Sequence, residues 1–320
     1  MKRRKSKEIK IGSVKIGADH PIAVQSMTFT KTANAAATVE QILSLERAGC
    51  DIVRFSVPDE ESAKSISYIK EHTHIPLVAD IHFNYKLALA ALERGIDKIR
   101  INPGNIGSPE RIKAVADACR TRGVPIRIGV NGGSLEKHIL AKYGSPTPEA
   151  LCESALYHVR LLEQFDFTDI VVSIKSSDVA DTVRANRLFA EKTDYPLHLG
   201  VTEAGTERMG IIKSSAGIGS LLLDGIGDTI RVSLTDEVEK EVAAARDLLK
   251  ALGLRGGVNI VSCPTCARTN IDVIGLATRL HALLDDCEKS IKVAVMGCAV
   301  NGPGEAKDAD IGIAGGLGEA

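Results

Sequence analysis

The chain has 320 residues, of which 40 are basic and 41 acidic, so its formal net charge is −1. A chain so balanced has no overall field to attract nucleic acid or a membrane surface, and charged ligands must be bound by local clusters. Hydrophobic residues make up 44% and charged residues 25%, which excludes wholesale disorder, while an aromatic content of 3% without Trp argues against stacking platforms for single-stranded nucleic acid.

The amino-terminal end carries a basic segment, residues 1–7, that is not followed by the apolar run of a secretory signal. No stretch of 18 apolar residues is present either. We therefore expect a solvated tail at residues 1–7 and a cytoplasmic protein without a membrane partner. Seven Cys fit this location, because thiols in a long chain without a signal serve as metal ligands or core residues rather than as a disulfide framework.

Helix ends and strand starts show the same pattern along most of the chain. Several helical stretches end in a Gly that is followed by a short β-branched run; these glycines are Gly49, Gly95, Gly123 and Gly225. Gly supplies the left-handed conformation that ends a helix, and the apolar run begins the next strand. Ser108 and Thr147, each followed by Pro, predict capping hydroxyls at two helix starts.

Eight strands are predicted, at residues 23–27, 52–57, 77–83, 98–102, 125–130, 170–175, 197–202 and 228–233. Each is followed by a helical pattern, except that the fifth is followed first by a long loop, residues 131–146. Eight alternating units in roughly 240 residues predict a (β/α)8 TIM barrel. The alternative, an open doubly wound sheet, should carry a glycine fingerprint after its first strand, and the sequence has none there.

The predicted barrel domain spans residues 1–253 and ends in a helix at 235–252. A Gly-rich linker follows, and residues 254–320 are predicted to form a small α+β domain. The elements of this domain are strands at 258–261, 291–296 and 310–313 and a helix at 271–284.

The predicted barrel strands carry polar residues at every second position near their carboxyl ends, where TIM-barrel sites lie. Five of these residues are cations that point toward one mouth: Arg54, Arg100, Arg127, Lys175 and Arg231. Unpaired buried charges cost several kcal/mol each, and a polyanion bound by Arg and Lys removes that cost. The pattern therefore predicts a phosphorylated substrate, most simply a diphosphate. The alternatives are a network with Asp80 and Glu203, or Arg side chains that face outward.

Three further residues at the strand ends have open roles. His82 and His198 each fit a ligand, an acid or a satisfied core residue. Glu203, directly after the seventh predicted strand, fits a general acid or base, and equally a loop carboxylate paired with a neighbouring Arg.

Three cysteines of the small domain follow predicted strands directly. Cys263 and Cys266 form a C-x-x-C turn after the first of these strands, and Cys298 follows the next. Parallel neighbouring strands bring such loops together, and three thiolates with one replaceable position favour an iron–sulfur cluster. Structural zinc and a redox-active dithiol remain open, as does the fourth ligand, for which Glu305, Cys287 and water are candidates. The remaining cysteines are predicted to pack in the core; they are Cys50, Cys119 and Cys152.

Five segments resemble the family of 4-hydroxy-3-methylbut-2-en-1-yl diphosphate synthases. The resemblance covers nearly the whole chain. They are Val24-Gln-Ser-Met-Thr, Lys98-Ile-Arg-Ile-Asn-Pro-Gly-Asn, Thr202-Glu-Ala-Gly, Ser262-Cys-Pro-Thr-Cys-Ala-Arg and Gly297-Cys-Ala-Val-Asn-Gly-Pro-Gly-Glu-Ala. The resemblance implies a TIM barrel followed by a cluster domain, and an iron–sulfur oxidoreductase of isoprenoid precursor biosynthesis by the methylerythritol phosphate route. Family members usually continue with a further strand and helix, so we expect the cluster domain here to be shortened at its carboxyl end.

The resemblance also implies a reaction and its partners. Such enzymes convert 2-C-methyl-D-erythritol 2,4-cyclodiphosphate to 4-hydroxy-3-methylbut-2-enyl diphosphate by a two-electron reduction with loss of water. Flavodoxin or ferredoxin supplies the electrons, and the enzyme is a head-to-tail homodimer. Two other classes stay open: a phosphate-binding barrel with a structural zinc site and no redox role, and a non-redox barrel enzyme such as a pterin-type synthase.

Residue roles follow from the same resemblance. A [4Fe–4S] cluster is expected on Cys263, Cys266, Cys298 and Glu305, and the harder, weaker carboxylate of Glu305 leaves one iron exchangeable. Glu203 is expected to assist at the substrate hydroxyl or to deliver a proton. The expected diphosphate-binding residues are Arg54, Arg100, Asn102, Arg127, Asn131 and Lys175, with Ser233 and Arg268 as weaker candidates.

Overall fold

The computed structural model describes residues 2–284, 287, 289–300 and 302–316, apart from the side chains of residues 103, 303 and 305. The chain divides into two compact units, Met1–Leu248 and Leu249–Ala320. Helix α10, Val238–Ala251, contains this division. The boundary expected at residue 253 stays a prediction.

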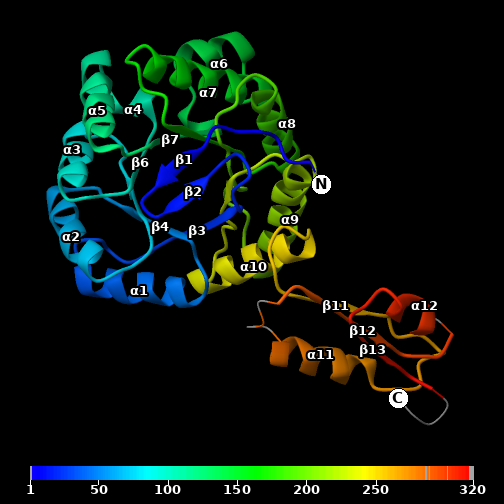
Figure 1. Ribbon diagram of the computed structural model, residues 1–320. Coiled ribbons are helices and arrows are strands. Elements are labelled where there is room, and N and C mark those ends of the chain that lie inside the picture. The colour runs from blue at the N-terminus through cyan, green and yellow to red at the C-terminus, as the bar shows by residue number, and fades with distance from the viewer. Residues whose placement is uncertain (1, 285–286, 288, 301, 317–320) are drawn as a thin grey trace. The chain divides into compact units, whose positions relative to one another are not determined.

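The first unit is a closed barrel of parallel strands inside a ring of helices (Figure 1). Its strands are β3 (Ala23–Met27), β4 (Ile52–Ser56), β5 (Leu77–Asp80), β6 (Lys98–Ile101), β7 (Ile126–Asn131), β8 (Ile170–Lys175), β9 (His198–Leu199) and β10 (Thr229–Ile230). Neighbours in the chain are neighbours in the sheet, and β10 pairs with β3. A parallel bridge between Val172 and Leu197 joins β8 to the start of β9 and closes the ring. The predicted (β/α)8 barrel is confirmed.

Helices cover the outside of the barrel. Those that follow the strands are α1 (Ala35–Arg47), α2 (Glu60–Glu71), α3 (Tyr85–Glu93), α5 (Pro109–Arg122), α7 (Pro148–Glu163), α8 (Val179–Ala190), α9 (Glu207–Leu223) and α10. The short helix α4, Pro103–Ile106, lies in the loop after β6. The long loop predicted at 131–146 is wrong in part, because it contains a 3-10 turn, Gly132–Ser134, and helix α6, Lys137–Tyr143.

The local signals account for most of the helix ends. The four predicted C-terminal glycines, Gly49, Gly95, Gly123 and Gly225, all have positive φ angles. At the start of α7 the Thr147 hydroxyl accepts a hydrogen bond from the Ala150 N–H at 3.2 Å, as predicted. The prediction for Ser108 is wrong, because its side chain makes no capping bond and its carbonyl oxygen accepts from the Arg111 N–H instead.

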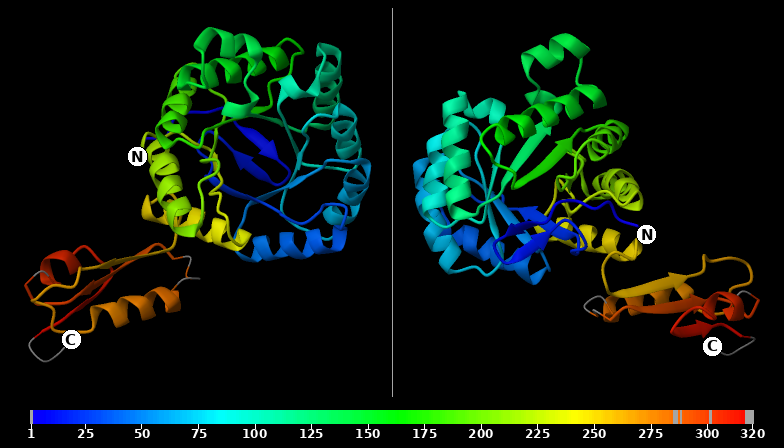
Figure 2. Two further views of the ribbon diagram at one scale, coloured as in Figure 1. Left: turned by 180° about the vertical axis from the view of Figure 1, so that it is seen from behind. Right: turned by 45° about the horizontal axis from the view of Figure 1, so that its top comes forward.

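A short antiparallel hairpin closes the amino-terminal end of the barrel. It consists of β1 (Ile9–Ile11) and β2 (Val14–Ile16), and Figures 1 and 2 show it across the inside of the ring. Its buried side chains Ile9, Ile11 and Ile16 form one apolar cluster with Ala23, Ile52, Val78 and Val171, which lie near the amino ends of β3, β4, β5 and β8. Ligands must therefore enter from the opposite end.

The solvated tail predicted at residues 1–7 is wrong for residues 2–7, which are the part of it that the structure describes. The Arg4 N–H donates to the Gly225 carbonyl at 2.9 Å, and the Arg4 guanidinium donates to the Thr193 and Tyr195 carbonyls at 2.6 Å. The Ser6 hydroxyl donates to the buried carboxylate of Asp228 at 2.6 Å. Basic side chains here satisfy carbonyl groups of the loops at the closed end of the barrel.

The second unit is a small three-stranded parallel sheet with two helices. Its elements are β11 (Val258–Ser262), α11 (Val273–Leu284), β12 (Ile291–Met296), α12 (Gly302–Ala306) and β13 (Ile311–Ala314). The sheet order is β11-β12-β13, and the predicted strands and helix of this region are confirmed. In the described part of the chain, no helix has the length and apolar character needed to cross a membrane.

The hairpin yields a stability prediction. Ile11 is fully buried, so Ile11→Ala should lower the free energy of unfolding by about 2 to 4 kcal/mol through lost burial and a new cavity. Urea unfolding of the purified protein measures this change. Val14→Ala, at a partly buried position of the same hairpin, is the matched control. Equal costs for the two variants would show that the hairpin does not seal the barrel.

Candidate functional site

A cavity of about 120 Å³ lies at the carboxyl ends of the barrel strands. Its walls come from β4, β6, β7 and β8 and from the segments that follow β9 and β10. The lining includes the five predicted cations Arg54, Arg100, Arg127, Lys175 and Arg231, together with Asn131 and Ser233. The alternative in which the arginines face outward between helices is therefore wrong.

Strand pairing explains why these side chains meet. Asp80 on β5 is the register partner of Arg100 on β6, which in turn is the partner of Arg127 on β7. Asn131 at the end of β7 is the partner of Lys175 at the end of β8. Side chains at paired positions point to the same face of a sheet, so alternation along each strand brings them together inside the barrel.

Two buried carboxylates offset part of the positive charge. Asp80 accepts a hydrogen bond from Arg100 at 2.9 Å and lies 3.6 Å from Arg54. Glu241 on α10 holds Arg231 in a bidentate pair, with both N–O distances 3.1 Å. Burial raises the pKa of Asp80, but Arg54, Arg100 and Arg127 lower it more, so this carboxyl stays ionised.

Arg127 and Lys175 have no acidic partner among the described residues. Arg127 is 1% exposed, and its Nε and Nη2 atoms are buried without a hydrogen-bond partner. Burial lowers the pKa values of Arg127 and Lys175 well below their usual range, and the neighbouring cations lower them further. A guanidinium keeps its proton even so, and both side chains are costly to bury without a partner. A bound anion removes this cost for both.

Two glycines leave the space that the cations occupy. A Cβ atom on Gly129 would lie 2.6 Å from the Arg100 Nε, and one on Gly200 would lie 2.6 Å from the Lys175 Nζ. Any larger side chain at these inward positions would push a cation out of the cavity. The alternation of Gly with charged residues at the strand ends is therefore part of the site.

A polar layer lies deeper in the barrel. The Lys98 ammonium is fully buried and donates to the Gln25 side-chain oxygen at 3.2 Å. His198 is fully buried with its Nδ1 atom 2.7 Å from the Thr229 hydroxyl. Burial and the surrounding cations lower the pKa of His198 well below its usual value, so the ring is neutral. His198 is therefore a hydrogen-bonded residue of the barrel interior and does not line the cavity.

The other predicted barrel residues lie outside the cavity lining. Asn102 is buried and its side-chain oxygen accepts from the Gly104 N–H at 3.0 Å. Glu203 is exposed, has a φ of +53°, and forms no ion pair within the described part of the chain. His82 is exposed as well and packs its ring near that of Phe83.

Glu241 is the site residue that the sequence reasoning missed. It lies on the buried face of α10 with Val238, Val242, Ala245 and Leu249. A carboxylate among apolar residues at helical spacing is the signal that identifies it, because charged residues are almost never fully buried unless they are paired.

The predicted cluster ligands lie on neighbouring loops of the second unit. Cys263 follows β11, and its sulfur accepts a hydrogen bond from the Gly297 N–H at 3.1 Å, next to Cys298. Hydrogen bonds from the backbone and side chain of Arg268 lower the pKa of Cys266, which favours its thiolate. Arg268 thus lies beside this thiol, and its expected part in diphosphate binding stays a prediction.

The donor set fits an iron–sulfur cluster in its chemistry, since thiolates and N–H donors to sulfur are what such clusters require. Within the described residues, no three His, Cys, Asp or Glu side chains are close enough to hold a single metal ion. Glu305 belongs to α12, but its side chain lies outside the described residues. The cysteines expected in the core are buried as predicted: Cys50, Cys119 and Cys152.

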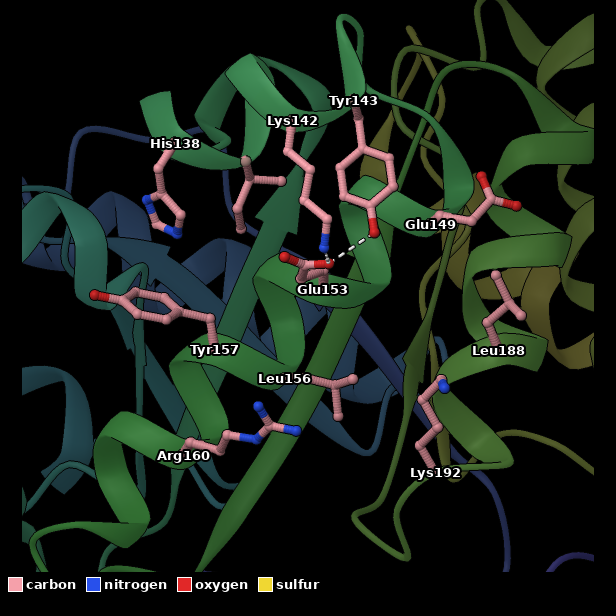
Figure 3. A pocket seen from close by; sticks show the side chains of 11 residues that line it. His138, Lys142, Tyr143, Glu149, Glu153, Leu156, Tyr157, Arg160, Leu188 and Lys192 are labelled. Carbon is pink, nitrogen blue, oxygen red and sulfur yellow. Dashed lines mark hydrogen bonds and ion pairs between the residues drawn. The ribbon is translucent and has the colours of Figure 1, made fainter.

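A larger pocket of about 510 Å³ lies outside the barrel, between α6, α7 and α8 (Figure 3). Its centre is the Glu153 carboxylate, which accepts from Lys142 at 2.6 Å and from the Tyr143 hydroxyl at 2.7 Å. These groups satisfy one another on the outer helices, so this pocket shows no excess of one charge comparable with that of the barrel cavity.

The unpaired cations should lower the free energy of unfolding and at the same time strengthen anion binding. Lys175→Met removes a charge from a cationic cavity and should raise the free energy of unfolding by about 1 kcal/mol or more, while it weakens pyrophosphate binding. Urea unfolding and calorimetry measure the two effects. Lys192→Met, at an exposed position of the outer pocket, should change neither. A Lys175→Met variant that is less stable than the parent would contradict the charge argument.

Comparisons with known proteins agree with this architecture. A family model described as the GcpE TIM-barrel domain matches residues 6–246, and one described as the GcpE protein C-terminal domain matches residues 259–320. Among solved structures, dihydropteroate synthase from Xanthomonas albilineans has a TM-score of 0.55 and 18% identity, and type I 3-dehydroquinate dehydratase from Clostridium difficile has 0.57 and 15%. Each covers 78% of this chain and 98% of that structure, and at such identity the likeness concerns the fold alone.

Much closer relatives exist among characterised sequences. A protein of Caldicellulosiruptor saccharolyticus is 60% identical over 314 residues, and one of Caldanaerobacter subterraneus subsp. tengcongensis is 62% identical over 315. Both are named 4-hydroxy-3-methylbut-2-en-1-yl diphosphate synthase (flavodoxin), and the matches cover 98% of this chain and 90% and 89% of the relatives. Matched in both of its units and along nearly its whole length, the chain belongs to the GcpE family.

Proposed function

We propose that this chain catalyses the reductive conversion of 2-C-methyl-D-erythritol 2,4-cyclodiphosphate to 4-hydroxy-3-methylbut-2-enyl diphosphate in isoprenoid precursor biosynthesis. The conversion consumes two electrons and two protons, breaks a carbon–oxygen bond of the cyclic diphosphate and releases one water. The observation that carries the proposal is the barrel cavity, where five cations converge and Asp80 and Glu241 offset only part of their charge. Relatives about 60% identical bear the name of this enzyme.

The cations divide into two groups with different roles in this proposal. Arg127 and Lys175 are free to take phosphate oxygens, Arg by paired N–H donors and Lys as a point charge. Arg54, Arg100 and Arg231 are held in place by carboxylates and so present fixed positive charge to the ligand. When the carbon–oxygen bond breaks, negative charge develops on the departing phosphate oxygen, and preorganised cations in a low-dielectric cavity stabilise it. Asn131 and Ser233 supply neutral hydrogen bonds at the same wall.

The reducing group in this proposal is a [4Fe–4S] cluster held by Cys263, Cys266, Cys298 and Glu305. When bound, it would supply single electrons at low potential and one exchangeable iron position. Gly297 and Arg268 support the thiolates through their hydrogen bonds. Glu305 as the carboxylate ligand comes from the family resemblance.

The remaining roles rest on resemblance and exposure. Glu203, exposed and unpaired among the described residues directly after the β9 segment, is proposed to deliver a proton to the departing hydroxyl. Flavodoxin is the proposed electron donor, because the relatives carry it in their names. The head-to-tail homodimer and the cytoplasmic location stay predictions.

Metal analysis tests the cofactor. Protein purified without oxygen should be brown and contain about four iron and four sulfide per chain, and it should turn over the cyclodiphosphate with a chemical reductant. Cys298→Ser should lose most of the iron, whereas Cys119→Ser, at a buried core position, should keep it. Colourless protein that holds zinc would instead support a phosphate-binding barrel without a redox role.

Calorimetry tests the diphosphate site. Arg127→Ala should weaken binding of the cyclodiphosphate by about 30-fold or more, which corresponds to about 2 kcal/mol for a lost charge-assisted contact. Arg160→Ala, an exposed residue of α7 in the outer pocket, is the control and should bind as the parent does. Unchanged affinity of a folded Arg127→Ala variant would place the anion elsewhere.

A further inference from the structure

A second polar cluster, partly buried, lies in the loops after β6 and β7 and on α7, and its members do not line the barrel cavity. It contains Asn102, Gly104, Glu136 and His158. Asn102 and Gly104 belong to the loop after β6, Glu136 directly precedes α6 in the loop after β7, and His158 lies on α7. Three segments that are distant in the sequence thus meet at one point of the barrel wall.

The central contact of the cluster is between Glu136 and His158. The His158 Nε2 atom lies 2.5 Å from the Glu136 Oε1 atom, and the side chains are 0% and 12% exposed. Burial raises the pKa of Glu136, but the contact with His158 and the hydrogen bonds from Ser154 and the backbone together lower it more, so the carboxylate stays ionised. A charge-assisted hydrogen bond in buried surroundings is strong and directional, which suits it to fix a loop.

Gly104 packs directly against this pair. A Cβ atom on Gly104 would lie 3.2 Å from the His158 Cε1 atom and 3.3 Å from both the Glu136 Oε1 and the Asn102 Oδ1 atoms. The Gly104 N–H donates to the Asn102 Oδ1 atom at 3.0 Å. The backbone of the loop after β6 therefore packs directly against the Glu136–His158 pair.

Each polar member of the cluster has one further atom without a partner. The Asn102 Nδ2, Glu136 Oε2 and His158 Nδ1 atoms are buried and unpaired among the described residues. Buried polar groups in native proteins are nearly always hydrogen-bonded, and an amide donor and a carboxylate acceptor complement each other. An amide nitrogen, a carboxylate oxygen and a ring nitrogen of the cluster can thus each form one further hydrogen bond.

We infer that the Glu136–His158 pair is a positioning device for the diphosphate site, an inference that rests on the proposed function. The pair links the loop after β7 to α7, and the loop after β6 packs against it at Gly104. Arg100 near the end of β6 and Asn131 at the end of β7 both line the cavity. By fixing the loop after β7 on α7 and giving the loop after β6 a surface to pack against, the pair positions these two wall residues, although neither Glu136 nor His158 lines the cavity.

Pyrophosphate affinity, measured by calorimetry on the anaerobically purified full chain, tests this inference together with the KM for the cyclodiphosphate. Glu136→Ala removes the central contact, and Gly104→Ala disturbs it by adding one methyl group. Glu153→Ala is the matched control, because Glu153 lies on the same helix as His158 and holds an ion pair in the outer pocket (Figure 3). Melting temperatures establish that each variant is folded.

Both cluster variants should raise the pyrophosphate dissociation constant and the KM by about fivefold to tenfold with a smaller change in kcat, because positioning errors well below 1 Å are costly at such sites. Glu136→Gln should restore most of the affinity, since its amide oxygen still accepts from His158. If every folded cluster variant stays within about twofold of Glu153→Ala, the inference is overturned. Parent protein that binds pyrophosphate but never turns over the cyclodiphosphate would sink the proposed function, while the pyrophosphate affinities still decide the role of Glu136.

Discussion

The excess of positive charge inside the barrel is the constraint on which the rest of the structure depends. Five cations surround one cavity, and within the described residues Asp80 and Glu241 are the carboxylates paired with them. Charges of one sign at such a density repel one another and are costly to remove from water. The positive charge of the cavity is therefore fully offset only when a polyanion binds. Arg127 and Lys175, the two cations without a carboxylate, are the ones that such a ligand pairs with.

The remainder of the barrel makes this charge density tolerable. Ile side chains of the β1–β2 hairpin seal one end, so water and ligands reach the cations from the carboxyl end alone. Gly129 and Gly200 provide the space in which Arg100 and Lys175 extend. Neutral partners hold the deeper polar layer, where Gln25 takes the Lys98 ammonium. The buried cations thus lower the stability of the fold, and the apolar packing at the base of the barrel and of its helices offsets this loss.

Local rules predicted the strands, most of the caps and the inward-facing cations, because alternation along a strand and the conformation of a terminal Gly depend on a few neighbouring residues. The same rules failed at the amino terminus. Two three-residue strands beside a basic segment give a weak signal, and the barrel end that accepts them exists only after folding. They also missed Glu241, whose importance comes from its ion pair with Arg231 in the segment between β10 and α10.

The sequence by itself determined the barrel, the small cysteine-bearing unit, the convergence of cations and the family that the chain resembles. Tertiary structure alone decided which cations are paired, which have no carboxylate partner, and that Glu136 and His158 join the loop after β7 to α7. The physical reason is range. Backbone preference and side-chain alternation act over a few residues, whereas an ion pair depends on distances of a few ångströms between segments that only the closed barrel brings together.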